Sequence, residues 1–515
     1  MFPKKLILCL TPLLIAACGP AREKEPNDSF QQATELRPGG TAVGTISSPT
    51  DVDWYRLDVR TEGSLSATLG GIRDVDFVLS AYDKDRRELM RVDETTVGGD
   101  ERLLDLGVSP GVYYLVVSNK NPTANNPTQE YRLKTSLDTA AGRERKPNDS
   151  ALTAQPIEAN GDVRGHYWPA HDLLADAPGA GEEDWYSVDV AQTGLFLLNV
   201  DVSEVPKVDP VLDVYDTNGY MLKEVDDGGI GEGESLRNFG VRGPAKYLLR
   251  LRSKYKTGNP DVPYDLMTEL LPYQGRTEFE PNDQLVDATP FSQDQIQGTI
   301  APAGDVDWYK ISVDSDAKML LRAEVSGVPH MDLTLSLKDS FGKNLVAVDN
   351  MGLEGPEVLT DWGVTKGDYY LVVSEKTGKR ADSRDPYTLS AKLSPWQAGL
   401  EWEPNDSTAT AQALDVGGSV DGYLAPKGDQ DWYVFNLYQS GAVEIDLTGV
   451  FNVAPSITLC DQDYKPVASS SAGKPGEPST LTAQLARGTY EIRLMPSDPS
   501  QNNVRDKYSL RILAK

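Results

Sequence analysis

The sequence predicts an all-β protein in which four tandem antiparallel β-sandwich domains follow a short apolar leader. Three observations indicate this fold class. Three sequence signatures recur four times in the same order along the 515 residues. Short segments rich in aromatic and β-branched residues alternate with turn sequences such as "DTNG" and "DSFG". No long segment has the periodicity of an amphipathic helix, so sandwiches are favoured over a parallel sheet.

The N-terminus predicts export and lipid attachment. Two lysines precede an apolar run that is too short for a membrane-spanning helix. The run closes in "LIAAC", which resembles the lipobox of bacterial lipoproteins. We expect residues 1–17 to be a signal peptide, Cys18 to be acylated and residues 18–22 to form a tether. The glycine after the cysteine favours the outer membrane, and an ordinary secretory signal is the alternative.

Three signatures divide the rest of the chain into four repeats. The first is a Pro-Asn-Asp turn, which reads "EPND", "KPND", "EPND" and "EPND". The second reads "DVDWYRLDV", "EEDWYSVDV", "DVDWYKISV" and "DQDWYVFNL". The third is a tyrosine-containing strand: "GVYYLVV", "AKYLLRL", "GDYYLVV" and "GTYEIRL". Each repeat has the size of an ordinary domain, and repeats 1 to 4 are predicted to span 23–138, 144–271, 278–394 and 401–515.

Within each repeat the tryptophan and tyrosine of the second signature are expected to pack the core or close its end. The linkers "SLDTAAGRER", "LLPYQGRTEFE" and "KLSPWQAGLEWE" are short. We therefore expect the four domains to be arrayed rather than freely dispersed.

The ordered signatures resemble the bacterial pre-peptidase C-terminal domain family. The resemblance covers nearly all of residues 23–515 in four copies. It implies a jelly-roll-like β-sandwich, and the collagenase relatives of the family include calcium-dependent collagen-binding modules. Members are usually appended to secreted proteases, whereas this chain contains no peptidase domain.

Acidic and amide side chains of the first two signatures form a candidate calcium site in repeats 1, 3 and 4. Calcium takes six to eight oxygen ligands, and six oxygen-bearing side chains would converge if the two segments meet at one end of the sandwich. Calcium-binding members of the family use acids and an asparagine in these places. The alternative is a turn whose side chains cap nearby backbone amides. The predicted ligands are Glu23, Glu25, Asn27, Asp28, Asp51 and Asp53; Glu278, Glu280, Asn282, Asp283, Asp305 and Asp307; and Glu401, Glu403, Asn405, Asp406, Asp429 and Asp431.

Repeat 2 departs from this pattern, and calcium is doubtful there. Lys146 stands where the other repeats have glutamate, and the connecting segment is lengthened by "PAHDLLADAPGAGE". We predict that the ammonium group lies near the remaining acids and substitutes for the ion. The polar residues of the two signatures in repeat 2, besides the lysine, are Glu144, Asn148, Asp149, Glu182, Glu183 and Asp184.

The inventory of reactive groups argues against an enzyme. The formal net charge of -28 and the scattered basic residues disfavour nucleic-acid binding. Neither a His-Glu-x-x-His motif nor a Gly-x-Ser-x-Gly elbow occurs. His166 and His171 could bind a transition metal, but an exposed loop pair is favoured. Cys460 is expected to be a small core residue.

The sequence thus predicts a non-enzymatic, outer-membrane-anchored lipoprotein that acts as a calcium-stabilised binding or scaffolding protein in the cell envelope. Its expected partners are the membrane, through the lipid, and an envelope protein or polysaccharide. Two alternatives stay open. One is adhesin-like capture through exposed strand tyrosines such as Tyr113, Tyr131 and Tyr369, and the other is an unrecognised envelope hydrolase with a carboxylate pair.

Overall fold

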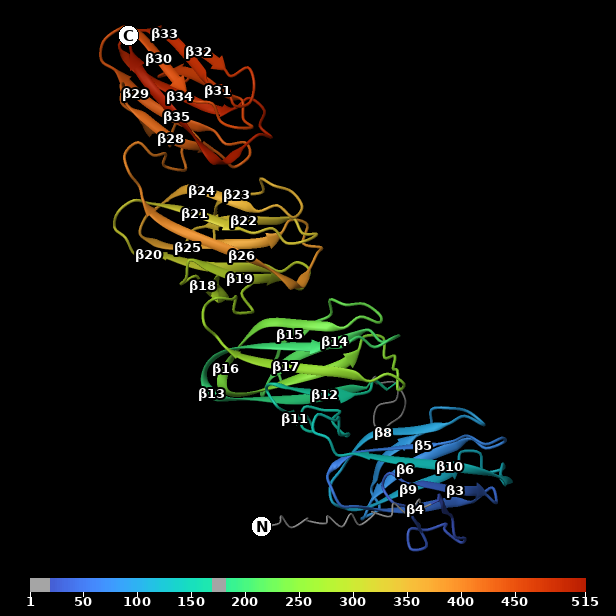
Figure 1. Ribbon diagram of the computed structural model, residues 1–515. Coiled ribbons are helices and arrows are strands. Elements are labelled where there is room, and N and C mark those ends of the chain that lie inside the picture. The colour runs from blue at the N-terminus through green and yellow to red at the C-terminus, as the bar shows by residue number, and fades with distance from the viewer. Residues whose placement is uncertain (1–18, 169–181) are drawn as a thin grey trace, which may run out of the picture. The chain divides into compact units, whose positions relative to one another are not determined.

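The computed structural model describes residues 19–168 and 182–515 and confirms the all-β fold class (Figure 1). The helical content of the described residues is one three-residue 3-10 helix, η1 (Leu285–Asp287). None of the helices in the described residues is long and apolar enough to cross a membrane. The proposed lipidation site Cys18 and His171 lie outside the described residues.

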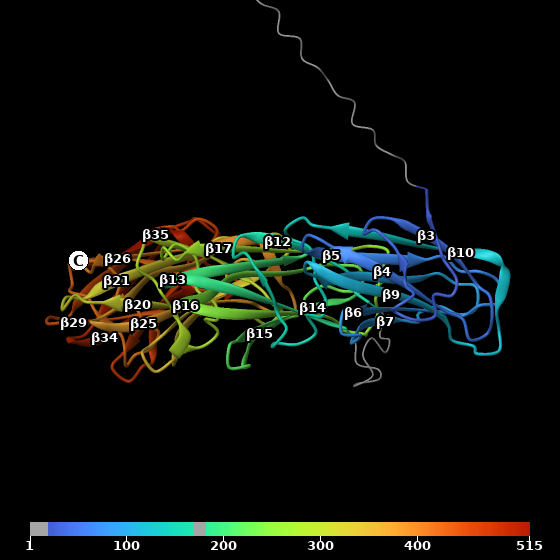
Figure 2. The same ribbon diagram turned by 90° about the horizontal axis from the view of Figure 1, so that it is seen from below.

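Repeat 1 forms two five-stranded sheets. Their strand orders are β1-β3-β10-β5-β8 and β2-β4-β9-β6-β7. Strands from distant parts of the repeat pair side by side, as β3 and β10 do in both ribbon views (Figure 1, Figure 2). The strands are β1 (Ala21–Arg22), β2 (Thr34–Glu35), β3 (Thr41–Ile46), β4 (Val52–Val59), β5 (Gly63–Leu69), β6 (Phe77–Asp83), β7 (Glu88–Val92), β8 (Glu101–Val108), β9 (Gly111–Asn119) and β10 (Asn126–Asp138).

Repeat 2 forms a single seven-stranded sheet of order β12-β17-β13-β16-β14-β15, with β11 paired to β13. Two of its strands, β13 and β16, are each 20 residues long. The strands are β11 (Gln155–Ile157), β12 (Gly161–Gly165), β13 (Glu183–Val202), β14 (Pro210–Asp216), β15 (Met221–Val225), β16 (Glu234–Ser253) and β17 (Tyr264–Pro272).

Repeats 3 and 4 share one topology, with a four-stranded and a five-stranded sheet each. The orders are β19-β26-β21-β24 and β18-β20-β25-β22-β23, then β28-β35-β30-β33 and β27-β29-β34-β31-β32. Repeat 3 contains β18 (Thr289–Pro290), β19 (Gln295–Ile300), β20 (Val306–Val313), β21 (Met319–Val325), β22 (Leu333–Lys338), β23 (Asn344–Val348), β24 (Glu357–Val364), β25 (Gly367–Glu375) and β26 (Asp382–Pro395). Repeat 4 contains β27 (Gln412–Ala413), β28 (Ser419–Leu424), β29 (Asp431–Leu437), β30 (Gly441–Leu447), β31 (Pro455–Asp461), β32 (Pro466–Ser471), β33 (Ser479–Leu485), β34 (Gly488–Pro496) and β35 (Asn503–Ala514).

The chain separates into two compact units, and the division passes through strands β13 and β16 of repeat 2. One unit holds repeat 1 and most of repeat 2. The other holds repeats 3 and 4 together with residues 192–200, 235–244 and 270 onwards. The features described below each lie within one of these units.

Alternation along the strands builds the cores. In β4 and β20 every second residue is buried, because successive side chains of a strand point to opposite faces. The tyrosine of the second signature is fully buried in all four repeats, as expected, at Tyr55, Tyr186, Tyr309 and Tyr433. Cys460 is also buried, in agreement with its predicted role as a small core residue.

Candidate metal centre

A backbone hydrogen bond joins the first two signatures at the end of each sandwich. The tryptophan amide of the second signature donates to the carbonyl of the asparagine in the Pro-Asn-Asp turn, at 2.8 to 3.0 Å in all four repeats. The bond Trp54 to Asn27 in repeat 1 recurs as Trp308 to Asn282 in repeat 3. It places the acids of the turn beside the aspartates that open strands β4, β20 and β29.

The structure brings the predicted ligands together in repeats 1, 3 and 4. In each acidic group, one oxygen from every carboxylate lies within 4.8 Å of the others. These oxygens are close enough to share one cation. The groups are Glu25, Asp51 and Asp53; Glu278, Glu280 and Asp307; Glu280, Asp283 and Asp305; and Glu401, Glu403 and Asp431.

The remaining predicted acids border these groups. Glu23 accepts hydrogen bonds from the Thr45 amide and hydroxyl at 2.8 and 3.1 Å, while its other oxygen is buried without a hydrogen-bond donor. Asp28 accepts a long bond, 3.4 Å, from the Val52 amide. In repeat 4, Asp406 lies close enough to Asp429 for each to affect the pKa of the other. All of the predicted acids therefore lie at or beside the clusters.

The asparagine of each turn adds a buried acceptor. Asn27, Asn282 and Asn405 have no exposed surface, and the side-chain oxygen of each has no hydrogen-bond donor. A buried amide oxygen without a donor is costly, because it has lost its water and gained no partner. An oxygen-seeking cation in the adjacent cluster would supply the missing interaction. The equivalent oxygen of Asn148 in repeat 2, where Lys146 occupies the site, also has no hydrogen-bond donor, so this feature is compatible with a cation but does not by itself require one.

Burial makes the clusters hard to ionise without a cation. Desolvation raises the pKa of Asp53 to about 8 and that of Glu278 to about 7, and neighbouring carboxylates add to both shifts. Burial likewise raises the pKa values of Glu403 and Asp431 well above their ordinary range. Burial therefore disfavours the charged forms of these four carboxyl groups, and a bound cation would offset that cost.

A pair of buried tyrosines forms the floor of each cluster. In repeat 3 the hydroxyls of Tyr309 and Tyr387 are 2.5 Å apart, and Tyr387 donates to Asp307 at 2.5 Å. A glycine of the first long strand makes room for them, because a Cβ on Gly298 would overlap Glu278 and both hydroxyls. The second tyrosine, in "EYRL", "PYDL", "PYTL" and "KYSL", is a site residue that the sequence reasoning missed.

In repeat 2 a buried ammonium group occupies the corresponding place. Lys146 Nζ lies 2.7 Å from Asp184 and 3.2 Å from Glu144, and it also contacts Glu182. Each of the four side chains is at most 4% exposed. The predicted position of the lysine among the acids is therefore confirmed.

One ammonium group does not neutralise three buried carboxylates. Burial opposes the charge of Lys146, but the carboxylates outweigh it and raise its pKa well above the ordinary value. Burial also raises the pKa of Glu182 to about 8 and that of Asp184 well above its usual range. Glu144 alone has a lowered pKa, because the attraction of Lys146 overcomes its desolvation.

The same turns also bond to the preceding repeat. The Lys146 amide donates to Asp105 at 2.7 Å, and the Gly107 amide returns a bond to the Lys146 carbonyl at 2.8 Å. Register shifts in β8 and β24 mark β-bulges near these contact points.

The equivalent bridges in repeats 3 and 4 are made by candidate ligands. The Glu280 amide donates to the backbone carbonyl of Asn238 at 3.0 Å, and the Gly240 amide donates to the backbone carbonyl of Glu280 at 2.6 Å. In repeat 4 the Gly363 amide donates to Glu403 at 3.1 Å. Glu280 and Glu403 therefore belong to an acidic cluster and to a junction between repeats.

His166 and Tyr131 differ from their predicted surroundings. His166 is not in an exposed loop pair, because its ring contacts Asp105 of repeat 1 at 2.6 Å and is only 20% exposed. Tyr131 is not an exposed strand tyrosine: it is fully buried and donates to Asp53 at 2.6 Å. Tyr113 and Tyr369 are partly buried against the cores, where each hydroxyl accepts a backbone amide. Of the three tyrosines suggested for a capture surface, Tyr131 is therefore excluded by its burial.

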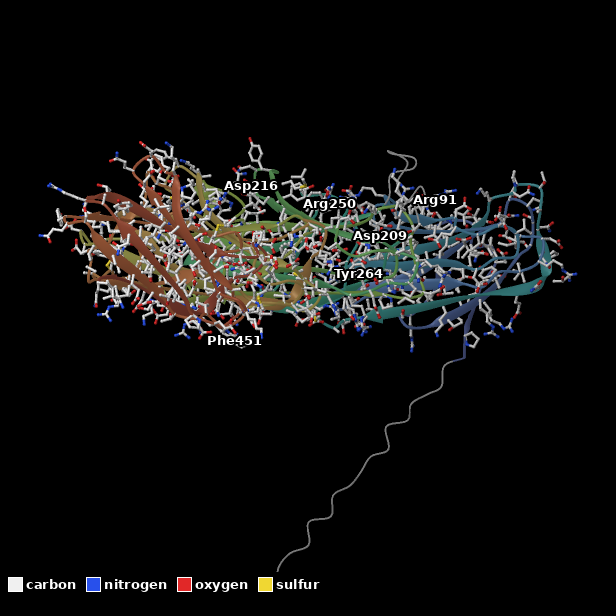
Figure 3. All side chains as sticks on the ribbon, turned by 90° about the horizontal axis from the view of Figure 1, so that it is seen from above. Arg91, Asp209, Asp216, Arg250, Tyr264 and Phe451 are labelled. Atoms are coloured by element: carbon white, nitrogen blue, oxygen red, sulfur yellow. The ribbon has the colours of Figure 1, made fainter. Side chains whose placement is uncertain are left out.

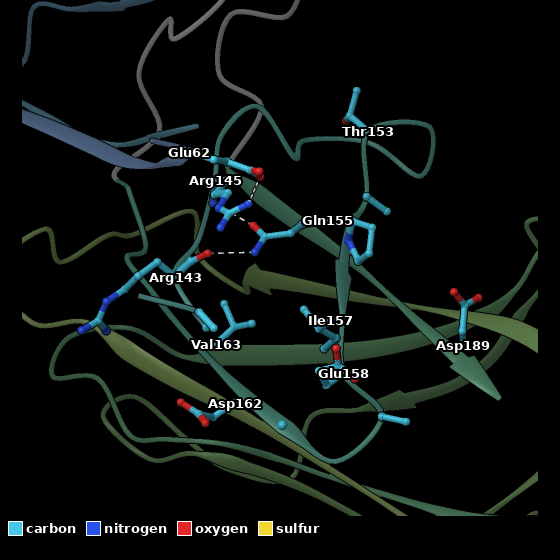
Figure 4. A pocket seen from close by; sticks show the side chains of 16 residues that line it. Glu62, Arg143, Arg145, Thr153, Gln155, Ile157, Glu158, Asp162, Val163 and Asp189 are labelled. Carbon is cyan, nitrogen blue, oxygen red and sulfur yellow. Dashed lines mark hydrogen bonds and ion pairs between the residues drawn. The ribbon is translucent and has the colours of Figure 1, made fainter. Parts of the chain in front are cut away.

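A pocket of about 840 Å³ lies between repeat 1 and the start of repeat 2 (Figure 4). Arg145 contacts Glu62 on one side, and the Arg145 amide donates to Gln155 at 2.7 Å. The described residues that line it include no histidine, cysteine or serine. The lining therefore lacks the pairing of nucleophile and histidine base that acyl transfer uses.

Comparisons with known proteins give only weak structural similarity. No protein-family model and no curated protein matches this sequence. Similar solved structures include the pre-peptidase C-terminal domain of a Bacillus anthracis collagenase, at 16% identity over 20% of this chain and 93% of that domain, with a TM-score of 0.18. Others are the triple jelly roll of an archaeal virus, at 10% identity over 68% of this chain and 83% of that chain (TM-score 0.18), and the BSP domain of a biofilm-associated protein, at 9% over 89% and 91% (TM-score 0.13).

Proposed function

We propose that this protein is a non-enzymatic, modular binding or scaffolding protein whose junctions between repeats are ordered by calcium. Acylation at Cys18 would anchor it to the outer membrane, where an envelope protein or polysaccharide is the expected partner. The single observation that carries the proposal is the double role of Glu280 and Glu403. Each contributes a carboxylate to a buried acidic cluster and a peptide group to the bridge with the preceding repeat.

Calcium fits these clusters by the chemistry of their donors. The donor sets contain only carboxylate and amide oxygens, which calcium prefers over softer metals. A zinc site would be expected to include histidine or cysteine, and the groups of adjacent ligand atoms in the described residues contain only aspartate and glutamate. The buried asparagine oxygens and the raised pKa values of the acids are the two features that a bound cation would relieve.

The coupling from ion to junction follows from connectivity. Without a cation, repulsion among Glu278, Glu280 and Asp307 favours conformations in which Glu280 moves outward. Such a movement pulls on the peptide of Glu280 and weakens its bonds to Asn238 and Gly240. Calcium would hold the carboxylate and so retain both bonds, which limits movement at the junction.

Hydrogen exchange of single amides tests this proposal. The amides of Gly240 and Gly363 donate to the backbone carbonyls of the candidate ligands Glu280 and Glu403. The amide of Gly107 donates to the backbone carbonyl of Lys146. We expect calcium to slow exchange at Gly240 and Gly363 by tenfold or more, which corresponds to about 1.4 kcal/mol of local stabilisation. Gly107 should be unaffected, because the ammonium group of Lys146 is present with or without calcium. Equal exchange with calcium and with chelator at all three glycines would refute the proposal.

A second experiment addresses the partner. The acylated protein, immobilised in calcium, is incubated with solubilised native envelope and then eluted with a chelator. A discrete protein or polysaccharide released by the chelator supports calcium-ordered binding. The same components retained regardless of calcium would indicate a constitutive scaffold instead.

A further inference from the structure

A second acidic set recurs in repeats 1 to 3, apart from the candidate calcium ligands. An aspartate precedes the first strand of a hairpin, a second aspartate follows its second strand, a glutamate comes eight residues later, and a lysine follows the tyrosine strand. The lysine amide donates to the carbonyl of the first aspartate at 2.7 to 2.9 Å in each repeat. The sets are Asp76, Asp93, Glu101 and Lys120; Asp209, Asp226, Glu234 and Lys254; and Asp332, Asp349, Glu357 and Lys376.

Repeat 4 has lost all four charged residues together. The equivalent positions are Ala454, Ser471, Ser479 and Ser497. The backbone bond persists there, because the Ser497 amide donates to the Ala454 carbonyl at 2.8 Å. This bond and the hairpin therefore form without the acids, so the fold alone does not explain why three repeats carry them.

In repeat 2 the three carboxylates converge. One oxygen each from Asp209, Asp226 and Glu234 lies within 4.8 Å of the other two. Asp209, one of the residues labelled in Figure 3, is only 3% exposed, and its Oδ1 is buried without a hydrogen-bond donor. Glu234 is 1% exposed, and each of its oxygens accepts one hydrogen bond from a backbone amide, that of Gly228 at 2.9 Å and that of Asp227 at 3.0 Å. Each Glu234 oxygen has a second lone pair.

The lysine of repeat 2 only partly offsets this charge. Lys254 Nζ pairs with Asp226 at 2.7 Å, and its side chain is 39% exposed. One ammonium group against three carboxylates leaves an excess of negative charge around the buried Asp209 oxygen. Carboxylate oxygens in this number and at this separation suit a hard divalent cation.

We propose that Asp209, Asp226 and Glu234 form a second divalent-cation site in repeat 2, independent of the sites at the Pro-Asn-Asp turns. The cation bridges the start of β14 to the segment that joins β15 and β16. The ion bound there is calcium or another oxygen-seeking divalent cation, and water completes its coordination. Repeat 2, which holds a lysine at the first site, thus binds a cation at the second.

Repeat 3 provides a matched contrast. There Asp332 Oδ1 is also buried without a hydrogen-bond donor, but Lys376 pairs with both aspartates, at 2.8 Å to Asp349 and 3.4 Å to Asp332. The ammonium group itself bridges the two carboxylates that, in repeat 2, would share the ion. Asp332→Asn is therefore the control for Asp209→Asn, since both change the equivalent aspartate.

Calcium bound per full-length chain, measured by equilibrium dialysis, tests the proposal. We expect Asp209→Asn to bind one calcium fewer than the unmodified protein, and Asp332→Asn to bind the same number. Equal stoichiometry for Asp209→Asn and the unmodified protein, or equal losses in both variants, would overturn the assignment. Because each result is a difference, it does not depend on how many ions the Pro-Asn-Asp turns hold.

A second measurement locates the ion directly. Crystals of the full chain soaked in terbium should give an anomalous peak between Asp209, Asp226 and Glu234, and the peak should vanish in Asp209→Asn crystals. Peaks at the Pro-Asn-Asp turns without one at this position would overturn only the second site. The reverse pattern would overturn the proposed function and leave this site standing.

Discussion

Replacing Lys146 with glutamate should convert repeat 2 from an ammonium-filled site into a calcium-dependent one. The variant Lys146→Glu restores the sequence "EPND" that the other repeats carry. It removes the one buried cation that contacts Glu144, Glu182 and Asp184, and it adds a fourth acid. Removing one partner of a buried ion pair typically costs about 3 to 5 kcal/mol. In chelator we therefore expect a loss of stability of at least this size.

Calcium should reverse much of that loss. A ligand at a hundredfold excess over its dissociation constant stabilises the folded state by about 2.7 kcal/mol. Urea unfolding in chelator and in calcium gives both quantities, and equilibrium dialysis should show one additional calcium per chain. The reciprocal variant Glu280→Lys is the control: it should bind less calcium and respond less to chelator. The reasoning fails if Lys146→Glu is as stable as the unmodified protein in chelator, or binds no additional calcium.

Two further predictions concern protons and close packing at the same sites. The pKa values of Asp53 and Glu278 are raised in the folded protein, so the folded state holds these protons more tightly than the unfolded state. Their contribution to the free energy of unfolding is complete below about pH 4 and is lost as the pH rises through about 7 to 8. The melting temperature in chelator should therefore fall between pH 5 and 8, and calcium should reduce this pH dependence. A pH-independent melting temperature in chelator would contradict the assignment. Gly298→Ala should cost about 1 to 3 kcal/mol in urea unfolding, because its Cβ would overlap Glu278 and two tyrosine hydroxyls. Gly352→Ala, whose Cβ would meet open space, should cost less than about 0.5 kcal/mol, and equal costs would refute the packing argument.

The sequence by itself determined the all-β fold class, and it also selected the acids that gather at the ends of the sandwiches. Both are local properties. Alternation with a period of two assigns residues to the faces of a strand, and a turn motif repeated four times marks the same position in each repeat. Even the exchange of glutamate for lysine at position 146 could be interpreted correctly, because opposite charges at neighbouring positions attract.

Only the tertiary structure decided which groups meet across the sequence. Tyr131 shares the buried face of β10 with Leu133, so alternation accounts for its burial, but only the pairing of β10 with β3 places its hydroxyl against Asp53. Glu280 joins the preceding repeat through its peptide group, which carries no sequence signal. The second acidic set in repeat 2 spans residues 209 to 254, and strand register brings it together. Register depends on the packing of whole sheets, so the local pattern that assigns a face does not identify the partner on it.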